Sequence, residues 1–144
     1  SIPQETIEEA AKIAEADPFI REMPEGYDSP ISQGGKNVSG GQKQRLCIAR
    51  AIATGAEILI FDDSFSALDY KTDRKVRENL AEYAKGTTKL IVAQRIGTIM
   101  DADLIVVLDE GKAVGMGKHK DLLRDCSVYR EIALSQLSKE ELGL

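Results

Sequence analysis

Two adjacent carboxylates, Asp62 and Asp63, directly follow the short apolar run 58–61. An unbroken run of this kind is typical of a strand buried on both faces of a parallel sheet, and such sheets bind ligands at the carboxyl ends of their strands. Two acids at the end of a buried strand repel each other and lose solvation unless a cation lies nearby. Mg²⁺ prefers such hard oxygen ligands, so the pair predicts a cation site. A turn with solvated carboxylates is the alternative.

The sequence Ser39-Gly40-Gly41-Gln42 is a second candidate site. Ser39 and Gln42 have the spacing of a capping box, which predicts that a helix begins here. The free N–H groups and partial positive charge of a helix start attract anions, and glycines let a phosphate approach the backbone closely. The motif therefore predicts either a phosphate-binding helix start or a capped, glycine-rich turn without a ligand.

The remaining pattern predicts the elements that position these residues. A helix is predicted from Thr6, which has capping-box spacing to Glu9, as far as the break at Asp17-Pro18. The loop-rich residues 23–37 are either a linker or a loop that contacts a partner. The other predicted elements are a short helix at 19–23, helices that end at Gly55 and Gly86, strands at 89–93 and 104–108, a turn at 109–112 into a strand at 113–116, and helices at 120–124 and 129–137. This alternation indicates an α/β fold with a parallel sheet covered by helices.

The composition excludes several classes of protein. Apolar residues make up 42% and charged residues 30% of the 144 residues, which is typical of a globular chain. The net charge of −5 argues against nucleic-acid binding, which favours a basic surplus. Two cysteines are too few for a disulfide framework. The apolar run 104–108 is far shorter than the roughly 20 residues that span a bilayer, and residues 1–19 lack the apolar core of a signal peptide.

Some further features are interpreted as structural rather than functional. The pairs Asp73–Arg77 and Arg74–Glu78 are interpreted as solvated charges, because charges at helical spacing are usually solvated. Cys47 is interpreted as a packing residue, because a cysteine in an apolar helix usually packs. His119 is interpreted as an ordinary surface residue.

Three stretches of the chain, in this order, resemble the nucleotide-binding domain of ABC transporters. They are NVSGGQKQRLCIARAI from Asn37, EILIFDDSFSALD from Glu57 and KLIVAQRIGTI from Lys89. Three ordered motifs at suitable spacing are far more specific than any one of them, and the resemblance covers essentially the whole chain. It implies a P-loop NTPase-type fold, with part of the helical subdomain in residues 1–54 and the later part of the RecA-like core in residues 55–144.

The resemblance also implies a motif for each candidate site. Residues 38–42 are similar to the signature motif, residues 58–62 to the Walker B strand and residues 66–69 to the D-loop. Gln94 falls at the position of the switch-histidine loop, and residues 23–37 resemble the segment of exporters that includes the X-loop. By this correspondence, Asp62 would bind Mg²⁺, and Asp63 and Gln94 would be the catalytic residues. The residues that would contact ATP are Ser39, Gly40, Gly41, Gln42 and Asp69.

Two catalytic positions depart from the family pattern. Asp63 stands where the family generally has a glutamate that aligns the attacking water, and its shorter side chain should lower the rate. Gln94 replaces the switch histidine; it can hydrogen-bond a phosphate but cannot become cationic. Together they resemble the degenerate site of a heterodimeric ABC exporter, in which two domains pack head to tail and each ATP lies between one domain's Walker motifs and the other's signature. A homodimer with slow turnover is the alternative.

The Walker A pattern G-x-x-x-x-G-K-[ST] does not occur in these 144 residues. We therefore expect the carboxyl-terminal part of such a domain, with a truncated sheet and unpaired strand edges. This part alone is expected to bind ATP weakly or not at all and to be inactive.

The resemblance implies partners and a location as well. The partners are a second nucleotide-binding domain and the coupling helices of a transmembrane domain, and the location is the cytoplasmic face of the cell membrane. Two alternatives remain. A chromosome-maintenance or repair ATPase also has a signature helix, although the coiled-coil pattern usual beside it is absent here. A stand-alone regulatory module that has lost ATP binding is the other.

Overall fold

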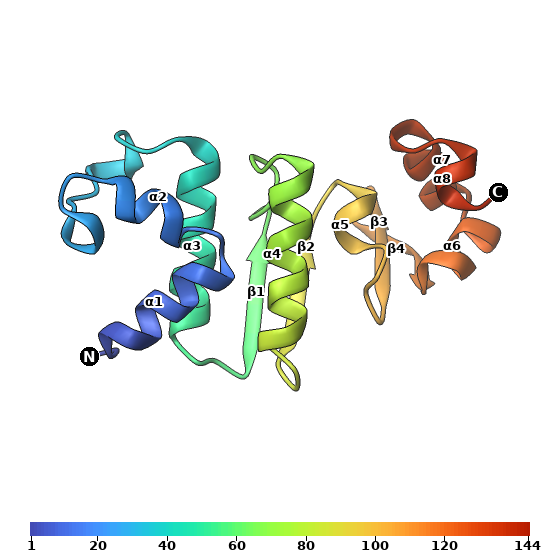
Figure 1. Cartoon of the computed structure of the whole chain (residues 1–144). Helices are drawn as coiled ribbons and strands as arrows, with labels where there is room; N and C mark the ends of the chain where they lie inside the picture. Colours follow the sequence, from blue (N-terminus) through green and yellow to red (C-terminus); the bar gives the residue numbers. More distant parts are fainter. The chain divides into compact units, whose positions relative to one another are not determined.

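The computed structural model describes residues 1–144, which form two compact units, Ser1–Val92 and Ala93–Leu144 (Figure 1). The first unit contains α1 (Gln4–Ile13), α2 (Asp17–Glu22), the 3-10 turns η1 (Gly26–Asp28) and η2 (Gln33–Gly35), α3 (Gly40–Ala53), β1 (Ile58–Asp62), α4 (Tyr70–Tyr83) and β2 (Thr88–Val92). The second contains α5 (Ile96–Ile99), β3 (Ile105–Asp109), β4 (Lys112–Gly117), α6 (His119–Asp125), α7 (Ser127–Gln136) and α8 (Lys139–Leu142). The chain has no helix with both the length and the apolar character that crossing a membrane requires.

The first helix differs from its prediction at both ends. It starts at Gln4 with Pro3 as its N-cap, so the predicted cap at Thr6 is wrong. It also ends before Asp17-Pro18, which instead begins α2, with the proline in the first turn. A proline is tolerated there because the first N–H groups of a helix have no partner within the helix.

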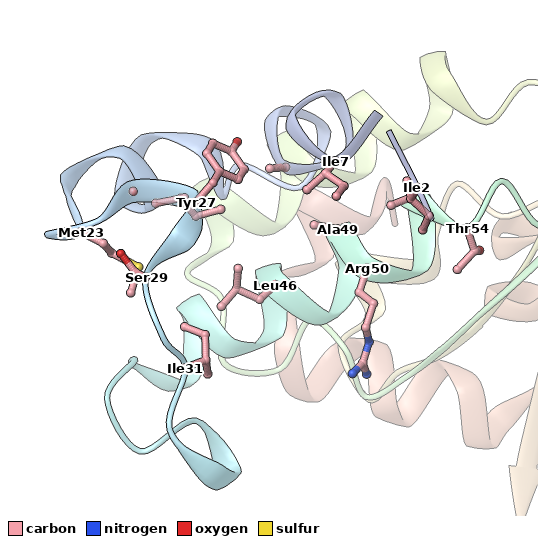
Figure 2. Close-up of a pocket in the computed structure, with 14 residues that line it drawn as sticks. Ile2, Ile7, Met23, Tyr27, Ser29, Ile31, Leu46, Ala49, Arg50 and Thr54 are labelled. Atoms are coloured by element: carbon pink, nitrogen blue, oxygen red, sulfur yellow. The ribbon is translucent and has the colours of Figure 1, made fainter. Parts of the chain in front are cut away.

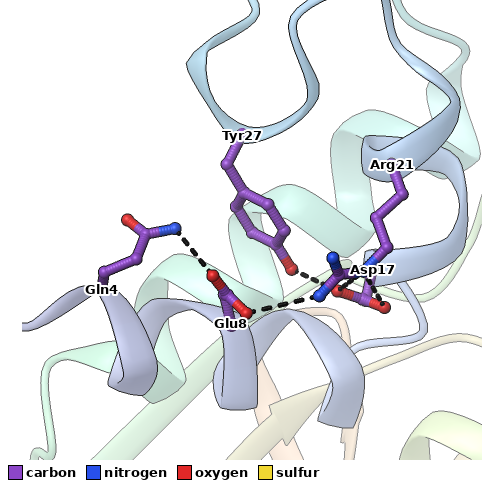
Figure 3. Close-up of polar contacts among 5 residues, drawn as sticks. All are labelled: Gln4, Glu8, Asp17, Arg21 and Tyr27. Carbon is purple, nitrogen blue, oxygen red and sulfur yellow. Dashed lines mark hydrogen bonds and ion pairs between the residues drawn. The ribbon is translucent and has the colours of Figure 1, made fainter.

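A polar network joins α1, α2 and η1 (Figure 3). Asp17 accepts hydrogen bonds from Arg21 at 2.9 Å and from the Tyr27 hydroxyl at 2.6 Å. Arg21 also reaches Glu8 on α1 at 3.3 Å, and Glu8 accepts from Gln4 at 3.1 Å. The network fixes the start of the loop-rich segment against the first two helices.

The third helix confirms its predicted bounds. Ser39 caps it, and Gly55, with φ of 64°, follows its last turn in the left-handed conformation that glycine adopts easily. Ile48 and Ile52 are buried, in one hydrophobic core with the small residues of α1. Those small residues are Ala10 and Ala11, and Ala14 at the C-cap of the helix is buried beside them.

The strands β1 and β2 pair in parallel, with Ile58 opposite Thr88 and Asp62 opposite Val92. Leu59 and Phe61 are buried, in one core with Val76 and Leu80 of α4. The other face of β1 is open, with Ile58 62% and Ile60 63% exposed. The prediction of a strand buried on both faces is therefore wrong for this chain, because no element of the first unit covers that side.

One of the two charge pairs on α4 is buried. Asp73 binds Arg77 at 2.7 Å, and their side chains are only 3% and 20% exposed. The interpretation of this pair as solvated charge is wrong, because Asp73 lies on the face of α4 that packs into the core. Arg74 and Glu78, at 2.8 Å, form the exposed pair that the sequence predicts.

The second unit contains an antiparallel hairpin. β3 pairs with β4, with Ile105 opposite Gly117 and Asp109 opposite Lys112. The predicted turn is confirmed: Glu110 and Gly111 have φ of 45° and 75°, the positive values of a two-residue hairpin turn. The predicted strand at 104–108 forms a separate two-stranded sheet with β4, and Leu104, Val106 and Leu108 are exposed, so the prediction of a third strand buried in one parallel sheet is wrong.

Helices α6 and α7 cover this hairpin and confirm the two predicted terminal helices within a few residues. A Cβ atom on Gly115 would lie 2.8 Å from the sulfur of Cys126, so β4 approaches the end of α6 where only glycine fits. His119 is not an ordinary surface residue, since it is half-buried and its Nδ1 lies 2.8 Å from the Tyr129 hydroxyl. The short helices α5 and α8 were not predicted, because four-residue helices carry almost no periodicity.

Candidate functional site

The start of α3 has the predicted capping box. The Ser39 hydroxyl accepts a hydrogen bond from the Gln42 N–H at 3.1 Å, and the Gln42 side chain accepts from the Ser39 N–H at 2.9 Å. Ser39 and Gly40 are exposed. The amino end of this 14-residue helix therefore faces solvent, with its first-turn N–H groups and partial positive charge directed toward any approaching anion.

The two glycines of this motif lie against the loop that follows β1. A Cβ atom on Gly41 would lie 3.1 Å from the carbonyl oxygen of Ala67, and one on Gly40 would lie 3.5 Å from the Ala67 Cβ. Gly41 thus permits a backbone approach that a larger residue would obstruct. The structure brings the motif together with the loop that begins at Asp63.

Asp62 and Asp63 are both exposed at the end of β1. The prediction that they are desolvated is therefore wrong for this chain. Asp63 has φ of 50°, a conformation that is uncommon for residues other than glycine. Its N–H donates to the Val92 carbonyl at 3.0 Å, and its carboxylate accepts from the Ser66 hydroxyl at 3.0 Å. These contacts hold the carboxylate within the loop.

Asp69 is the N-cap of α4. Its carboxylate accepts from the Thr72 N–H at 2.9 Å and from the Thr72 hydroxyl at 2.7 Å. These hydrogen bonds, first the one from the backbone N–H, lower the pKa of Asp69 below its ordinary value because they favour the charged form. The residue is therefore ionised near neutral pH and fixes the start of the helix.

Gln44 is a residue of this region that the sequence analysis missed. Its amide group donates to the Asp63 carbonyl at 2.9 Å and to the Ser66 hydroxyl at 3.0 Å, and it accepts from the Ala67 N–H at 2.8 Å. These partners lie 19 to 23 residues away in the sequence, so no local pattern indicates them. The only available signal was a polar residue one turn after the capping box.

Arg45 supports the same helix from its other side. Its guanidinium group donates to the Glu15 carbonyl at 2.6 Å and lies 4.7 Å from the centre of the Phe19 ring. Burial lowers the pKa of Arg45, and the charges of Asp69 and Glu15 partly oppose that shift. Arg45 therefore ties α3 to the segment between α1 and α2.

Gln94 lies in the second unit, on the loop between β2 and α5. Its carbonyl accepts a hydrogen bond from the Gln136 side chain at 2.8 Å, and the oxygen of that same amide accepts from the Ile96 N–H at 2.9 Å. Gln136, near the end of α7, was also missed by the sequence analysis, since its partners lie about 40 residues earlier.

Side chains of histidine, cysteine, aspartate and glutamate form no cluster of three or more that could hold a metal ion. A Mg²⁺ ion bound together with a nucleotide needs only one or two carboxylates, because phosphate oxygens and water supply its other ligands. Asp62, exposed at the end of β1, fits that smaller requirement.

An apolar groove of about 350 Å³ lies beside α3 (Figure 2). Ile7 of α1, Tyr27 and Ile31 of the loop-rich segment, and Leu46 and Arg50 of α3 line it. In Figure 2 the guanidinium group of Arg50 points away from the apolar side chains.

Cys47 on the same helix is exposed, so its interpretation as a packing residue is wrong.

Comparisons with known proteins agree with this fold. The family model of ABC transporters matches residues 1–66. A putative ABC transporter ATP-binding protein of Mycoplasma genitalium is 49% identical over 92% of this chain and 21% of its own length. The ATP-dependent lipid A-core flippase of Pseudomonas aeruginosa is 43% identical over 96% of this chain and 23% of its own length.

A solved structure, that of a bacterial Atm1-family ABC exporter with ATP bound, has a TM-score of 0.89 and 37% identity to this chain. It matches over 94% of this chain and 24% of that protein. The chain is therefore similar to ATP-binding proteins of the ABC transporter family. It is similar to part of the nucleotide-binding domain of an ABC exporter, and it spans less than a quarter of the length of each of these relatives.

Proposed function

We propose that this chain is part of the ATP-hydrolysing domain of an ABC exporter, in which it completes the nucleotide site of a partner domain. The observation that carries the proposal is the exposed, capped start of α3 at Ser39, held against the loop that contains Asp63. Relatives at 43% identity include the lipid A-core flippase and the alpha-hemolysin translocation ATP-binding protein of Proteus vulgaris. Their named activities support an export function for the longer protein.

The proposed roles follow the local geometry. The N–H groups at the start of α3 and the Ser39 hydroxyl bind the phosphates of the ATP held by the partner. Asp62 is a ligand of the Mg²⁺ in this chain's own site, where the ion would neutralise charge on the phosphates when bound. Asp63 aligns the attacking water, and Gln94 hydrogen-bonds the terminal phosphate. Asp69 holds the loop between Asp63 and α4 in place.

We propose that the partner domain differs from this one and that the dimer packs head to tail. The shorter carboxylate of Asp63 and the uncharged amide of Gln94 make this chain's own site the slower one. Residues 1–54 form the signature part of the helical subdomain, and residues 55–144 form the later part of the ATP-binding core. The loop-rich segment 23–37 contacts the coupling helices of a transmembrane domain, at the cytoplasmic face of the membrane.

Substitutions at Ser39 and Asp63 test this proposal in the intact protein with its partner. Ser39→Arg places bulk and positive charge at the helix start, and we expect ATP turnover to fall at least about 100-fold. Asp63→Asn should change turnover by less than about threefold. Ser138 offers a matched control, because it caps α8 with the same type of capping box. Ser138→Arg should leave turnover unchanged.

The results of these substitutions distinguish an asymmetric dimer from a homodimer. Equal losses from Ser39→Arg and Asp63→Asn would show that this chain's own site is competent, which fits a homodimer and contradicts the asymmetric dimer. Full turnover in Ser39→Arg would contradict the proposed function as a whole.

A further inference from the structure

The amide group of Gln44 is the main polar link between α3 and the loop that follows β1. It uses both of its N–H donors, on the Asp63 carbonyl at 2.9 Å and the Ser66 hydroxyl at 3.0 Å, and its oxygen accepts from the Ala67 N–H at 2.8 Å. A primary amide has two donors and one acceptor oxygen, so every polar atom of this group is engaged in the same loop.

A second contact on the same face of α3 aligns the loop. Gly41 lies three residues before Gln44, which places the two on neighbouring turns of one helix face. The Ala67 carbonyl lies 3.1 Å from the position of a Gly41 Cβ atom, so the loop contacts the helix there without a side chain between them. The loop is therefore fixed at two points, by close approach at Gly41 and by hydrogen bonds at Gln44.

The link extends to the carboxylate of Asp63. The Ser66 hydroxyl accepts from Gln44, which leaves its single hydrogen to donate to the Asp63 carboxylate at 3.0 Å. Asp63 itself has the uncommon φ of 50°, so contacts from outside the loop are needed to maintain its backbone conformation. Gln44 supplies one of them at the Asp63 carbonyl.

We infer that Gln44 is a positioning residue that couples the two nucleotide sites of the dimer. The inference rests on the proposed function, in which the start of α3 serves the partner's ATP and the Asp63 loop serves this chain's own. The three hydrogen bonds of Gln44 make these two structures move as one body, so that a change in the loop at one site alters the helix start at the other. Such coupling requires a physical link between the sites, and this side chain is a direct one.

The test is Gln44→Leu in the intact protein with its partner, measured as ATP turnover against ATP concentration. Leucine keeps a similar volume but makes none of the three hydrogen bonds. We expect kcat to fall about tenfold while KM stays within about twofold, because the substitution alters relative placement and not the groups that contact ATP.

Controls separate this inference from a folding defect and from the proposed function. Gln4→Leu is the matched substitution, because Gln4 bonds only within α1, to Glu8 at 3.1 Å. If Gln44→Leu does not fold, Gln44→Glu retains the size and the acceptor for Ala67 but loses both donors, and it should lower kcat at least as far because its carboxylate would face the Asp63 carbonyl. A kcat equal to that of Gln4→Leu, in a protein whose turnover is abolished by Ser39→Arg, overturns the inference alone. A wild-type protein without ATP turnover overturns the proposed function itself.

Discussion

Each compact unit has a candidate loop that is hydrogen-bonded by a glutamine side chain, and the two glutamines differ in the number of hydrogen bonds they make. In the first unit, Gln44 makes three hydrogen bonds to the loop that begins at Asp63. In the second, Gln136 makes two, on the backbone of Gln94 and Ile96. The first loop is thereby joined to another candidate motif at the start of α3. The second loop is held to a helix that carries no candidate site.

The ion pairs differ in the same way. Asp73 and Arg77 of the first unit are 3% and 20% exposed, whereas Arg124 of the second unit and its partner Asp121 are 68% and 57% exposed. A buried pair depends on both partners, because either charge left alone in the interior is costly. The first unit therefore contains a buried ion pair beside exposed ones, whereas the pair of Arg124 and Asp121 in the second unit is exposed.

The largest expected effect is that of Arg77→Met, which removes the guanidinium group that bonds the buried carboxylate of Asp73 at 2.7 Å. We expect a loss of about 3 kcal/mol in the free energy of unfolding of the first unit. Urea unfolding followed by hydrogen exchange in each unit measures it. Arg74→Met removes the exposed pair on the same helix and should cost less than about 0.5 kcal/mol. Equal costs for the two variants would contradict the contrast between enclosed and exposed pairs.

Substituting alanine for Gly41 and for Gly97 compares the space available to an added Cβ atom in the two units. A Gly41 Cβ atom would lie 3.1 Å from the Ala67 carbonyl, so Gly41→Ala should destabilise the first unit by about 2 kcal/mol. Gly97 of α5 has no atom within 4 Å of its Cβ position, so Gly97→Ala should be neutral or stabilising by about 0.5 kcal/mol. Thermal melts of the two variants measure both effects, and a neutral Gly41→Ala would show that the loop yields easily.

Gln136→Leu should have a smaller effect, confined to the second unit. It removes the acceptor of the Ile96 N–H, and Ile96 is 2% exposed, so we expect a cost of about 1 kcal/mol. Hydrogen exchange at Ile96 should accelerate while exchange in residues 63–67 stays unchanged. Faster exchange in both regions would contradict the view that each glutamine holds only its own loop.

The smallest expected effect is a difference in pH dependence. Burial lowers the pKa of His119 below its ordinary 6.5, a shift that the charge of Lys120 reinforces and that of Asp101 opposes. The folded state thus prefers the neutral ring, whose contribution is complete above about pH 6.5 and is lost as pH falls through the folded pKa. We expect the second unit to lose stability below pH 6.5, and His119→Gln to remove that slope in urea unfolding curves.

The first unit contains no histidine and should behave differently in the same measurement. The hydrogen bond from Arg21 lowers the pKa of Asp17 below its ordinary 3.8, so its contribution is complete above that pH and is lost only in stronger acid. A fall in the stability of the first unit between pH 6.5 and 5 would contradict this assignment.

The sequence by itself determined the features that depend on near neighbours. The capping box of Ser39 and Gln42 and the turn at Glu110-Gly111 are confirmed, because each rests on contacts within about three residues. The α/β class is confirmed for the same reason, since the helix and strand periods are local patterns. The roles assigned to Asp62, Asp63 and Gln94 stay predictions.

Only the tertiary structure decided which polar groups are enclosed and which strands pair. The partners of Gln44 lie 19 to 23 residues away, and those of Gln136 about 40, so no local pattern could show them. Asp73 is buried because of what packs over its helix face, and Ile60 is exposed because nothing in its unit covers it. Local spacing defines which face a residue shares, but burial depends on the element that comes to lie against that face.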